Sequence, residues 1–154
     1  MPQGIHNIEV DLSISTIWKF VSVLENWIPL VPGYLSHEII NDRQVAWSFV
    51  GDIGILKKTI NLQVDIIEWT EPTAVRFTLN GTSGSFTGEG FFKAQELGPD
   101  KTRMTGFLDI TAKGLKAPMV NSILKTHVPQ MTTDLAEAIA DRMCETAGIL
   151  RNRA

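Results

Sequence analysis

Few side chains in this sequence have the type and spacing that support catalysis or metal binding. The three histidines, His6, His37 and His127, lie far apart in the chain, and the single cysteine, Cys144, lies at the apolar edge of a helical segment. None of them forms a close His/Cys pair of the kind that holds zinc. The chain also lacks GxSxG, phosphate-loop and dinucleotide-binding motifs. We therefore predict no metal site and no cofactor, and we expect Cys144 to be a structural thiol.

The bulk composition is typical of one globular domain over residues 1–154. Hydrophobic residues make up 44% of the chain and charged residues 20%, which is ordinary for such a domain. The net charge of −3 and the absence of a dense Lys/Arg stripe argue against a nucleic-acid partner. There is no signal-peptide pattern, no apolar stretch of transmembrane length and no cysteine pair, so we expect a cytoplasmic protein.

Hydrophobic periodicity predicts the order of the secondary-structure elements. The segment "GIHNIEVDLS" alternates in polarity, which predicts a strand, and Ser13 or Ser15 can cap a short amphipathic helix in "ISTIWKFVSVLEN". From Tyr34 to Ile110 the period is two, with turn sequences such as "GDIG", "TEPT" and "NGTSG" between the runs. This pattern predicts six antiparallel strands, each with one apolar face, and Leu35, His37 and Ile39 share such a face.

The last part of the chain returns to helical spacing. Its apolar stripe consists of Leu124, Val128, Met131, Leu135, Ile139 and Met143. Pro118 suits a helix start, whereas Pro129 lacks the N–H group that a helix interior uses. The helix therefore begins near Pro129 or is kinked there, and we favour a kink because the stripe continues on both sides.

Seven strands with one apolar face need a cover, and the long helix is the only predicted element large enough. Glycines that would help the sheet to bend are Gly81, Gly84, Gly88, Gly90 and Gly106. We therefore predict an α+β fold in which a curved seven-stranded antiparallel sheet surrounds a long C-terminal helix, with short helices after the first strand. Such an arrangement easily leaves a gap between the sheet and the helix.

Three stretches carry a family resemblance: "IEVDLSISTIWKFVSVLENWIPLVPG", "VGDIGILKKTINLQVDIIEWTEP" and "FTLNGTSGSFTGEGFF". With the order of elements, they resemble the helix-grip fold of the START/Bet v1-like (SRPBCC) superfamily. Within it the chain is most similar to the CoxG-like group, named after a carbon monoxide dehydrogenase protein, and to its polyketide-cyclase-like neighbours. In that group a helix with a tryptophan precedes a Pro-Gly pair, and Trp18 and Pro32-Gly33 match those positions.

The resemblance implies that the short helices close one end of an internal cavity. Pro29, Pro32 and Gly33 would fix a tight return into the second strand, and Trp27 would line or plug the mouth, or would simply belong to the core. Longer members of the group carry a C-terminal extension linked to membrane attachment. The present sequence stops at "GILRNRA", and Pro129 interrupts a helix that the resemblance predicts to be smooth. Both departures argue against a membrane-recruitment role.

Strand parity identifies the candidate lining of that cavity. If the apolar faces point inward, the charged residues that point outward are Asp65, Glu68, Arg76, Glu89, Arg103 and Asp109. The residues that we expect to line a ligand cavity are Trp27, Phe49, Leu62, Val64, Phe77, Leu79, Phe92, Leu108, Leu124, His127 and Met131. Among inward positions only His37, His127 and Lys58 are polar. Lys58 is read as a rim residue or as the result of a bulge near Gly54.

Three roles are open for His37 and His127. Each is a hydrogen-bonded structural residue, a polar handle for a ligand, or a general acid or base. Because acid–base catalysis needs an ionisable group within reach of the substrate, the apolar lining favours binding over turnover. The leading hypothesis is a protein that binds or transports a hydrophobic small molecule, such as a lipid, quinone or polyketide.

Two other functions stay open at this stage. One is an enzyme of the cyclase or dehydratase type with His37 or His127 as acid or base. The other is an accessory protein of a carbon monoxide dehydrogenase-type metalloenzyme, although no docking patch stands out in the sequence. The pattern of residues names neither the ligand nor a protein partner.

Overall fold

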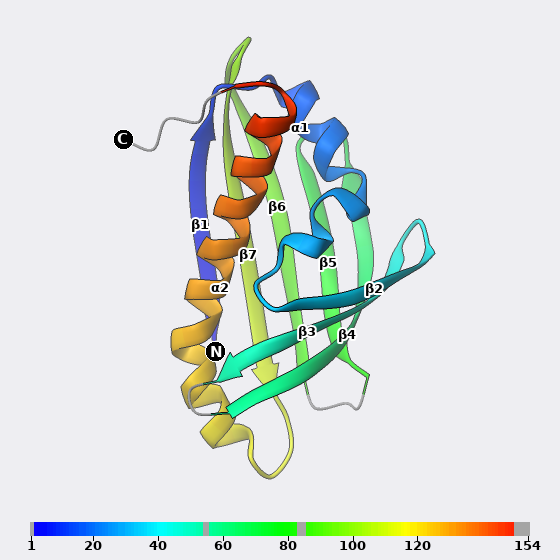
Figure 1. Ribbon diagram of the computed structural model, residues 1–154, viewed down its shortest axis with the longest axis vertical. Helices are drawn as coiled ribbons and strands as arrows, with labels where there is room; N and C mark the ends of the chain where they lie inside the picture. The colour runs from blue at the N-terminus through cyan, green and yellow to red at the C-terminus, as the bar shows by residue number, and fades with distance from the viewer. Residues whose placement is uncertain (1, 54–55, 83–85, 150–154) are drawn as a thin grey trace.

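The computed structural model describes residues 2–53, 56–82 and 86–149. Figure 1 shows a strongly curved antiparallel sheet with one long helix, α2 (Ala117–Thr146), lying against its concave side. Three short helical segments lie over the same side, toward the C-terminal end of α2. The α+β helix-grip fold predicted from the sequence is thereby confirmed.

The sheet has seven strands in the spatial order β1-β7-β6-β5-β4-β3-β2. Their bounds are β1 (Gln3–Val10), β2 (Tyr34–Asn41), β3 (Gln44–Ile53), β4 (Leu56–Thr70), β5 (Ala74–Gly81), β6 (Phe86–Gly98) and β7 (Lys101–Ala112). Every neighbouring pair is antiparallel. The first strand pairs with the last, so β1 and β2 form the two edges of the sheet.

The short helices follow β1 directly. They are α1 (Ile14–Val21) and two single-turn 3₁₀ helices, η1 (Leu24–Asn26) and η2 (Ile28–Leu30). Ser13 caps α1, since its Oγ accepts a hydrogen bond of 3.2 Å from the Thr16 amide. Ile17 and Trp18 face the core from α1, and Ile28 does so from η2. The segment therefore covers part of the concave face that α2 leaves free.

Helix α2 runs without a break through Pro129. The helix therefore does not begin near Pro129, and the kink expected at this position stays a prediction. The hydroxyl of Thr132, one turn further on, donates a hydrogen bond of 2.7 Å to the Val128 carbonyl. Both Thr132 and Val128 are buried, so this part of α2 faces the sheet.

Helix α2 packs mainly against β1 and β7, at one side of the sheet. Small residues permit this close approach. A Cβ atom added at Gly4 of β1 would lie 2.8 Å from the Pro129 Cα atom, and one at Gly106 of β7 would lie 3.9 Å from the Ala136 Cβ atom. The concave face of β4 to β6 is consequently left to core side chains, to the short helices and to open space, whereas β3 also approaches α2.

Edge strand β2 corrects one prediction. Leu35 and Ile39 were expected to share a buried face, yet their side chains are 52% and 38% exposed. A register irregularity between Tyr34 and Ser36 leaves Leu35 outside the ladder, and Tyr34 is the residue that pairs with Phe49 of β3. Because β2 is an irregular edge strand that pairs only with β3, the burial of its side chains does not follow the alternation of its sequence.

We expect the substitution Gly4→Ala to lower the free energy of unfolding by about 1–3 kcal/mol, because the new methyl group would overlap the backbone of α2. Gly106→Ala is the matched control, since its methyl group would meet Ala136 at ordinary contact distance. Urea unfolding followed by circular dichroism measures both. Equal midpoints for the two variants would contradict the proposed tight contact at Gly4.

Candidate functional site

A cavity of about 440 Å³ lies between α2 and the concave face of the sheet. Its lining comprises Pro32, Gly33, Phe49, Val50, Ile60, Leu62, Phe86, Ile110, Leu124, His127, Val128, Gln130, Met131 and Asp134. The walls from β3, β4, β6 and β7 are apolar. The return between η2 and β2 is tied to this wall, since the Val50 amide donates a hydrogen bond of 2.8 Å to the Gly33 carbonyl.

The polar side chains of this cavity all come from α2. His127, Gln130 and Asp134 are spaced by three and four residues and therefore lie on one face of the helix. His127 is half-buried, whereas Gln130 and Asp134 are exposed. The Gln130 Nε2 atom donates a hydrogen bond of 2.8 Å to the Asp134 Oδ1 atom. The cavity thus combines an apolar interior with a polar edge toward the solvent.

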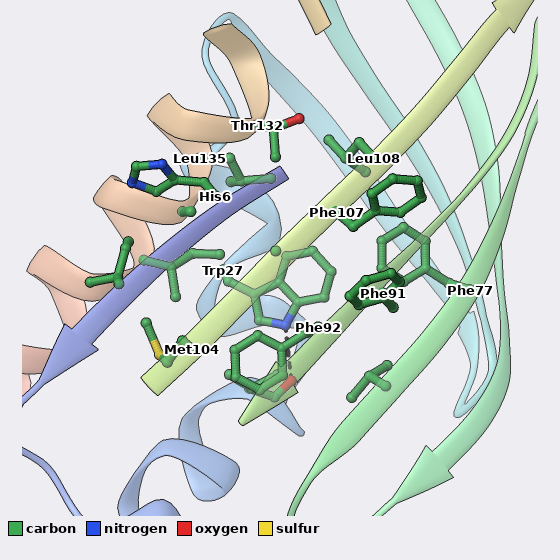
Figure 2. A pocket seen from close by; sticks show the side chains of 16 residues that line it. His6, Trp27, Phe77, Phe91, Phe92, Met104, Phe107, Leu108, Thr132 and Leu135 are labelled. Atoms are coloured by element: carbon green, nitrogen blue, oxygen red, sulfur yellow. Dashed lines mark hydrogen bonds between the residues drawn. The ribbon is translucent and has the colours of Figure 1, made fainter. Parts of the chain in front are cut away.

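A second cavity, of about 70 Å³, lies further along α2 toward the C-terminal end of the helix (Figure 2). Its lining consists of His6, Ile8, Val21, Trp27, Val75, Phe77, Phe91, Phe92, Met104, Gly106, Phe107, Leu108, Thr132, Leu135, Ala136 and Ile139. The space suffices for a few water molecules or a small apolar group, but not for a molecule of drug size. His6 stands at the edge of this space, with its Nε2 atom 2.8 Å from the Glu137 Oε2 atom of α2.

A row of three aromatic side chains leads from one cavity to the other. The rings of Trp27 and Trp47 meet edge to face with centroids 6.1 Å apart, and Phe49 lies 5.7 Å beyond Trp47. Trp27 lines the smaller cavity and Phe49 the larger one. The indole N–H of Trp27 donates a buried hydrogen bond of 2.9 Å to the Val21 carbonyl, which fixes the ring. The Trp47 N–H is buried without a partner among the described residues.

The structure divides the predicted lining residues between the two cavities. Those at the larger cavity are Phe49, Leu62, Leu124, His127 and Met131, and those at the smaller one are Trp27, Phe77, Phe92 and Leu108. Val64 and Leu79 are buried in the core and line neither. Whether any of these residues contacts a ligand stays a prediction.

The other polar candidates lie elsewhere. His37 lines neither cavity, and its Nδ1 atom lies 2.6 Å from the hydroxyl of Tyr34, so its surroundings match the structural role. The structure describes the backbone of Lys58 but not its side chain, so its predicted rim position stays a prediction. Within the described ranges, no group of three His, Cys, Asp or Glu side chains converges on a point where a metal ion would bind.

Sequence reasoning missed several site residues for which signals exist. Gln130 and Asp134 follow His127 at helical spacing, so a helical projection would have placed all three together. His6 alternates with Ile8 in the first strand, and the same parity that places Ile8 inside places His6 there as well.

Two acidic residues of the outer face of the sheet, Asp109 and Glu68, lie outside both cavities. Asp109 was expected to be solvated, yet it is only 6% exposed, and Gln3 donates a hydrogen bond of 3.2 Å to its Oδ2 atom. The pKa of Glu68 is held below its ordinary value, chiefly because the Thr70 hydroxyl donates a hydrogen bond of 2.7 Å to its carboxylate. Neither residue lines a cavity, so neither can take part in chemistry there.

Comparison with known proteins agrees with this architecture. A protein-family model matches residues 1–145, and no curated protein matches the sequence. A conserved protein from Geobacillus kaustophilus is 17% identical, with 94% of this chain and 96% of that chain covered and a TM-score of 0.77. A START superfamily protein from Mycobacterium smegmatis is 24% identical, with 94% and 98% covered and a TM-score of 0.70.

A third solved structure, the Zhui aromatase/cyclase from a Streptomyces species, is 14% identical, with 96% and 98% of the chains covered and a TM-score of 0.71. The fold and the cavity beside α2 define a helix-grip domain. The chain has the fold of the START/Bet v1-like superfamily. Membership of the narrower CoxG-like group stays a prediction. Among the described helices, none combines the length and apolar character needed to cross a bilayer.

We expect Trp27→Phe to destabilise the protein by about 1–2 kcal/mol more than Trp47→Phe, because only the first leaves a buried carbonyl without its donor. The two variants remove the same atoms from neighbouring buried rings, so each controls for the other. Chemical unfolding measures the difference. An equal or larger loss for Trp47→Phe would contradict the role assigned to the Trp27 hydrogen bond.

Proposed function

We propose that the protein binds a hydrophobic small molecule with one polar end in the larger cavity. The observation that carries this proposal is the space of about 440 Å³ with apolar walls and polar side chains on one side only. Pockets for small organic ligands have volumes of about 300–1,000 Å³ and place a few polar groups in a mostly apolar lining. The smaller cavity is too small for such a molecule.

The polarity of the lining defines an orientation for the ligand. Its apolar part would pack against Phe49, Leu62 and Leu124, where burial of hydrocarbon supplies the binding free energy. Its polar end would face His127 and Gln130 at the solvent edge, where a ring nitrogen and an amide can donate or accept hydrogen bonds. Lipids, quinones and polyketide-like molecules all have this two-ended character.

A cavity-filling substitution tests the proposal. Met131→Trp should weaken binding of the neutral fluorescent probe N-phenyl-1-naphthylamine by about tenfold or more, because the larger side chain occupies the space that the probe needs. Ile67→Trp is the control, because Ile67 is 49% exposed and lines neither cavity. Fluorescence titration gives both dissociation constants. The proposal fails if the unaltered protein does not bind the probe, or if both variants bind it equally well.

A second function, enzymatic turnover of the cyclase type, is favoured by the position of His127. Of the two histidines considered as acid or base, only His127 reaches the large cavity. The similarity in fold to an aromatase/cyclase is consistent with this alternative.

For a substrate that the protein converts, we expect His127→Gln to lower kcat by about a hundredfold while the dissociation constant stays within about tenfold. Product formation under single-turnover conditions and equilibrium binding measure the two quantities. A parallel loss of binding and turnover would assign His127 to ligand orientation instead of catalysis.

A further inference from the structure

The connection between β7 and α2 has a charge unlike that of the rest of the chain. Between Asp109 and Asp134 the sequence contains Lys113, Lys116 and Lys125 and no acidic residue, although the whole protein carries a net charge of −3. All three lysine side chains are exposed. None of them forms an ion pair with a residue in the described ranges. Their charges are therefore available to an external anionic partner.

Exposed apolar side chains lie among these lysines. Leu115 is 104% exposed, which means that its side chain contacts almost nothing in the protein, and Met119 in the first turn of α2 is 55% exposed. Figure 1 shows that this connection and the start of α2 form one end of the molecule and project beyond the strands. We call residues 113–125 the basic tip, and its exposed apolar side chains are Leu115 and Met119.

The backbone of the tip is held in place by local hydrogen bonds. Gly114 has a φ of +99°, a left-handed turn that glycine adopts without strain, and its carbonyl accepts a hydrogen bond of 3.1 Å from the Ala117 amide. The side chain of Asn121 bridges back to β7, accepting a bond of 2.7 Å from the Ala112 amide and donating one of 3.2 Å to the Ala112 carbonyl. Leu115 is therefore presented outward by an ordered turn.

We propose that the basic tip docks on the surface of an anionic lipid bilayer. A fully exposed leucine flanked by lysines suits the headgroup boundary, where the apolar side chain enters the acyl region and the ammonium groups meet lipid phosphates. The tip has no aromatic side chain for stacking on bases, so a bilayer fits it better than a nucleic acid. The sequence argument against membrane recruitment concerned a C-terminal extension and Pro129, neither of which belongs to this surface.

The basic tip and the lining of the larger cavity share one half of α2, which would place a docked bilayer near the cavity. Leu124, His127 and Met131 line the larger cavity from the same half of α2 that begins at the tip. A bilayer in contact with residues 113–125 would therefore lie near the wall of the cavity, where an apolar molecule enters or leaves. Docking itself does not depend on ligand binding, so vesicle binding and probe binding can fail independently.

Vesicle sedimentation tests the proposal. The protein is mixed with vesicles of phosphatidylcholine alone or of equal parts phosphatidylcholine and phosphatidylglycerol, at low and at high salt. We expect binding to the mixed vesicles at low salt, with affinity falling as salt screens the lysines. Leu115→Ser should lower the affinity for the mixed vesicles by about tenfold. The double variant Lys113→Glu with Lys116→Glu should remove the part of the affinity that depends on salt.

Two control variants test whether exposed residues outside the basic tip contribute to vesicle binding. Ile5→Ser removes another exposed apolar side chain, 62% exposed on β1, and Lys19→Glu reverses a lysine of α1. Both variants should bind like the unaltered protein. In a second readout, the fluorescence of the tryptophan introduced by Leu115→Trp should shift to the blue with mixed vesicles, and that of Ile5→Trp should not.

Three results would overturn the proposal. The first is a lack of binding to mixed vesicles at low salt, and the second is equal binding by the tip variants and the controls. The third is concentration-dependent dimerisation in sedimentation velocity that Leu115→Ser abolishes, without any vesicle binding. That result would assign the tip to a second copy of the chain.

Discussion

The close contact of α2 with β1 and β7 is the constraint on which the rest of the structure depends. Gly4 lets the helix backbone approach the first strand at Pro129, and His6 reaches Glu137 from the same strand at 2.8 Å. The sheet then curves around the helix, and β3 also approaches α2. Apolar side chains and the short helices fill part of the space in between, and the remainder is open. The larger cavity is thus a consequence of where the helix lies.

Helix α2 contributes differently to the molecule along its length. Its buried stripe, with Val128 and Leu135, completes the core, and its side chains at 127, 130 and 134 supply the polar edge of the cavity. Its first turn carries Met119, which belongs to the basic tip. Core packing and the two proposed roles, ligand orientation and surface docking, therefore all depend on the position of this one rigid element, so a shift of α2 would alter all three together.

Much of the fold was predictable because its signals are local. Alternating strands, the serine cap at Ser13 and the apolar stripe of α2 are encoded within short windows of sequence. Leu35 was misassigned because the irregular pairing of an edge strand is not visible in its alternation. The site was less predictable, since cavity volume depends on how residues distant in sequence fill one space. Val64 and Leu79 have the same inward parity as Leu62, yet only Leu62 reaches open volume.

The central claim is that a hydrophobic small molecule with one polar end occupies the larger cavity beside α2. Methyl-labelled NMR of the protein titrated with oleate tests it most directly, because it reports where the ligand lies. We predict saturable shifts at the methyl groups of Leu62, Leu124 and Met131, with the methyl groups of Ile5 and Ile67 unchanged. An unchanged spectrum, or shifts confined to Ile5 and Ile67, would contradict the claim.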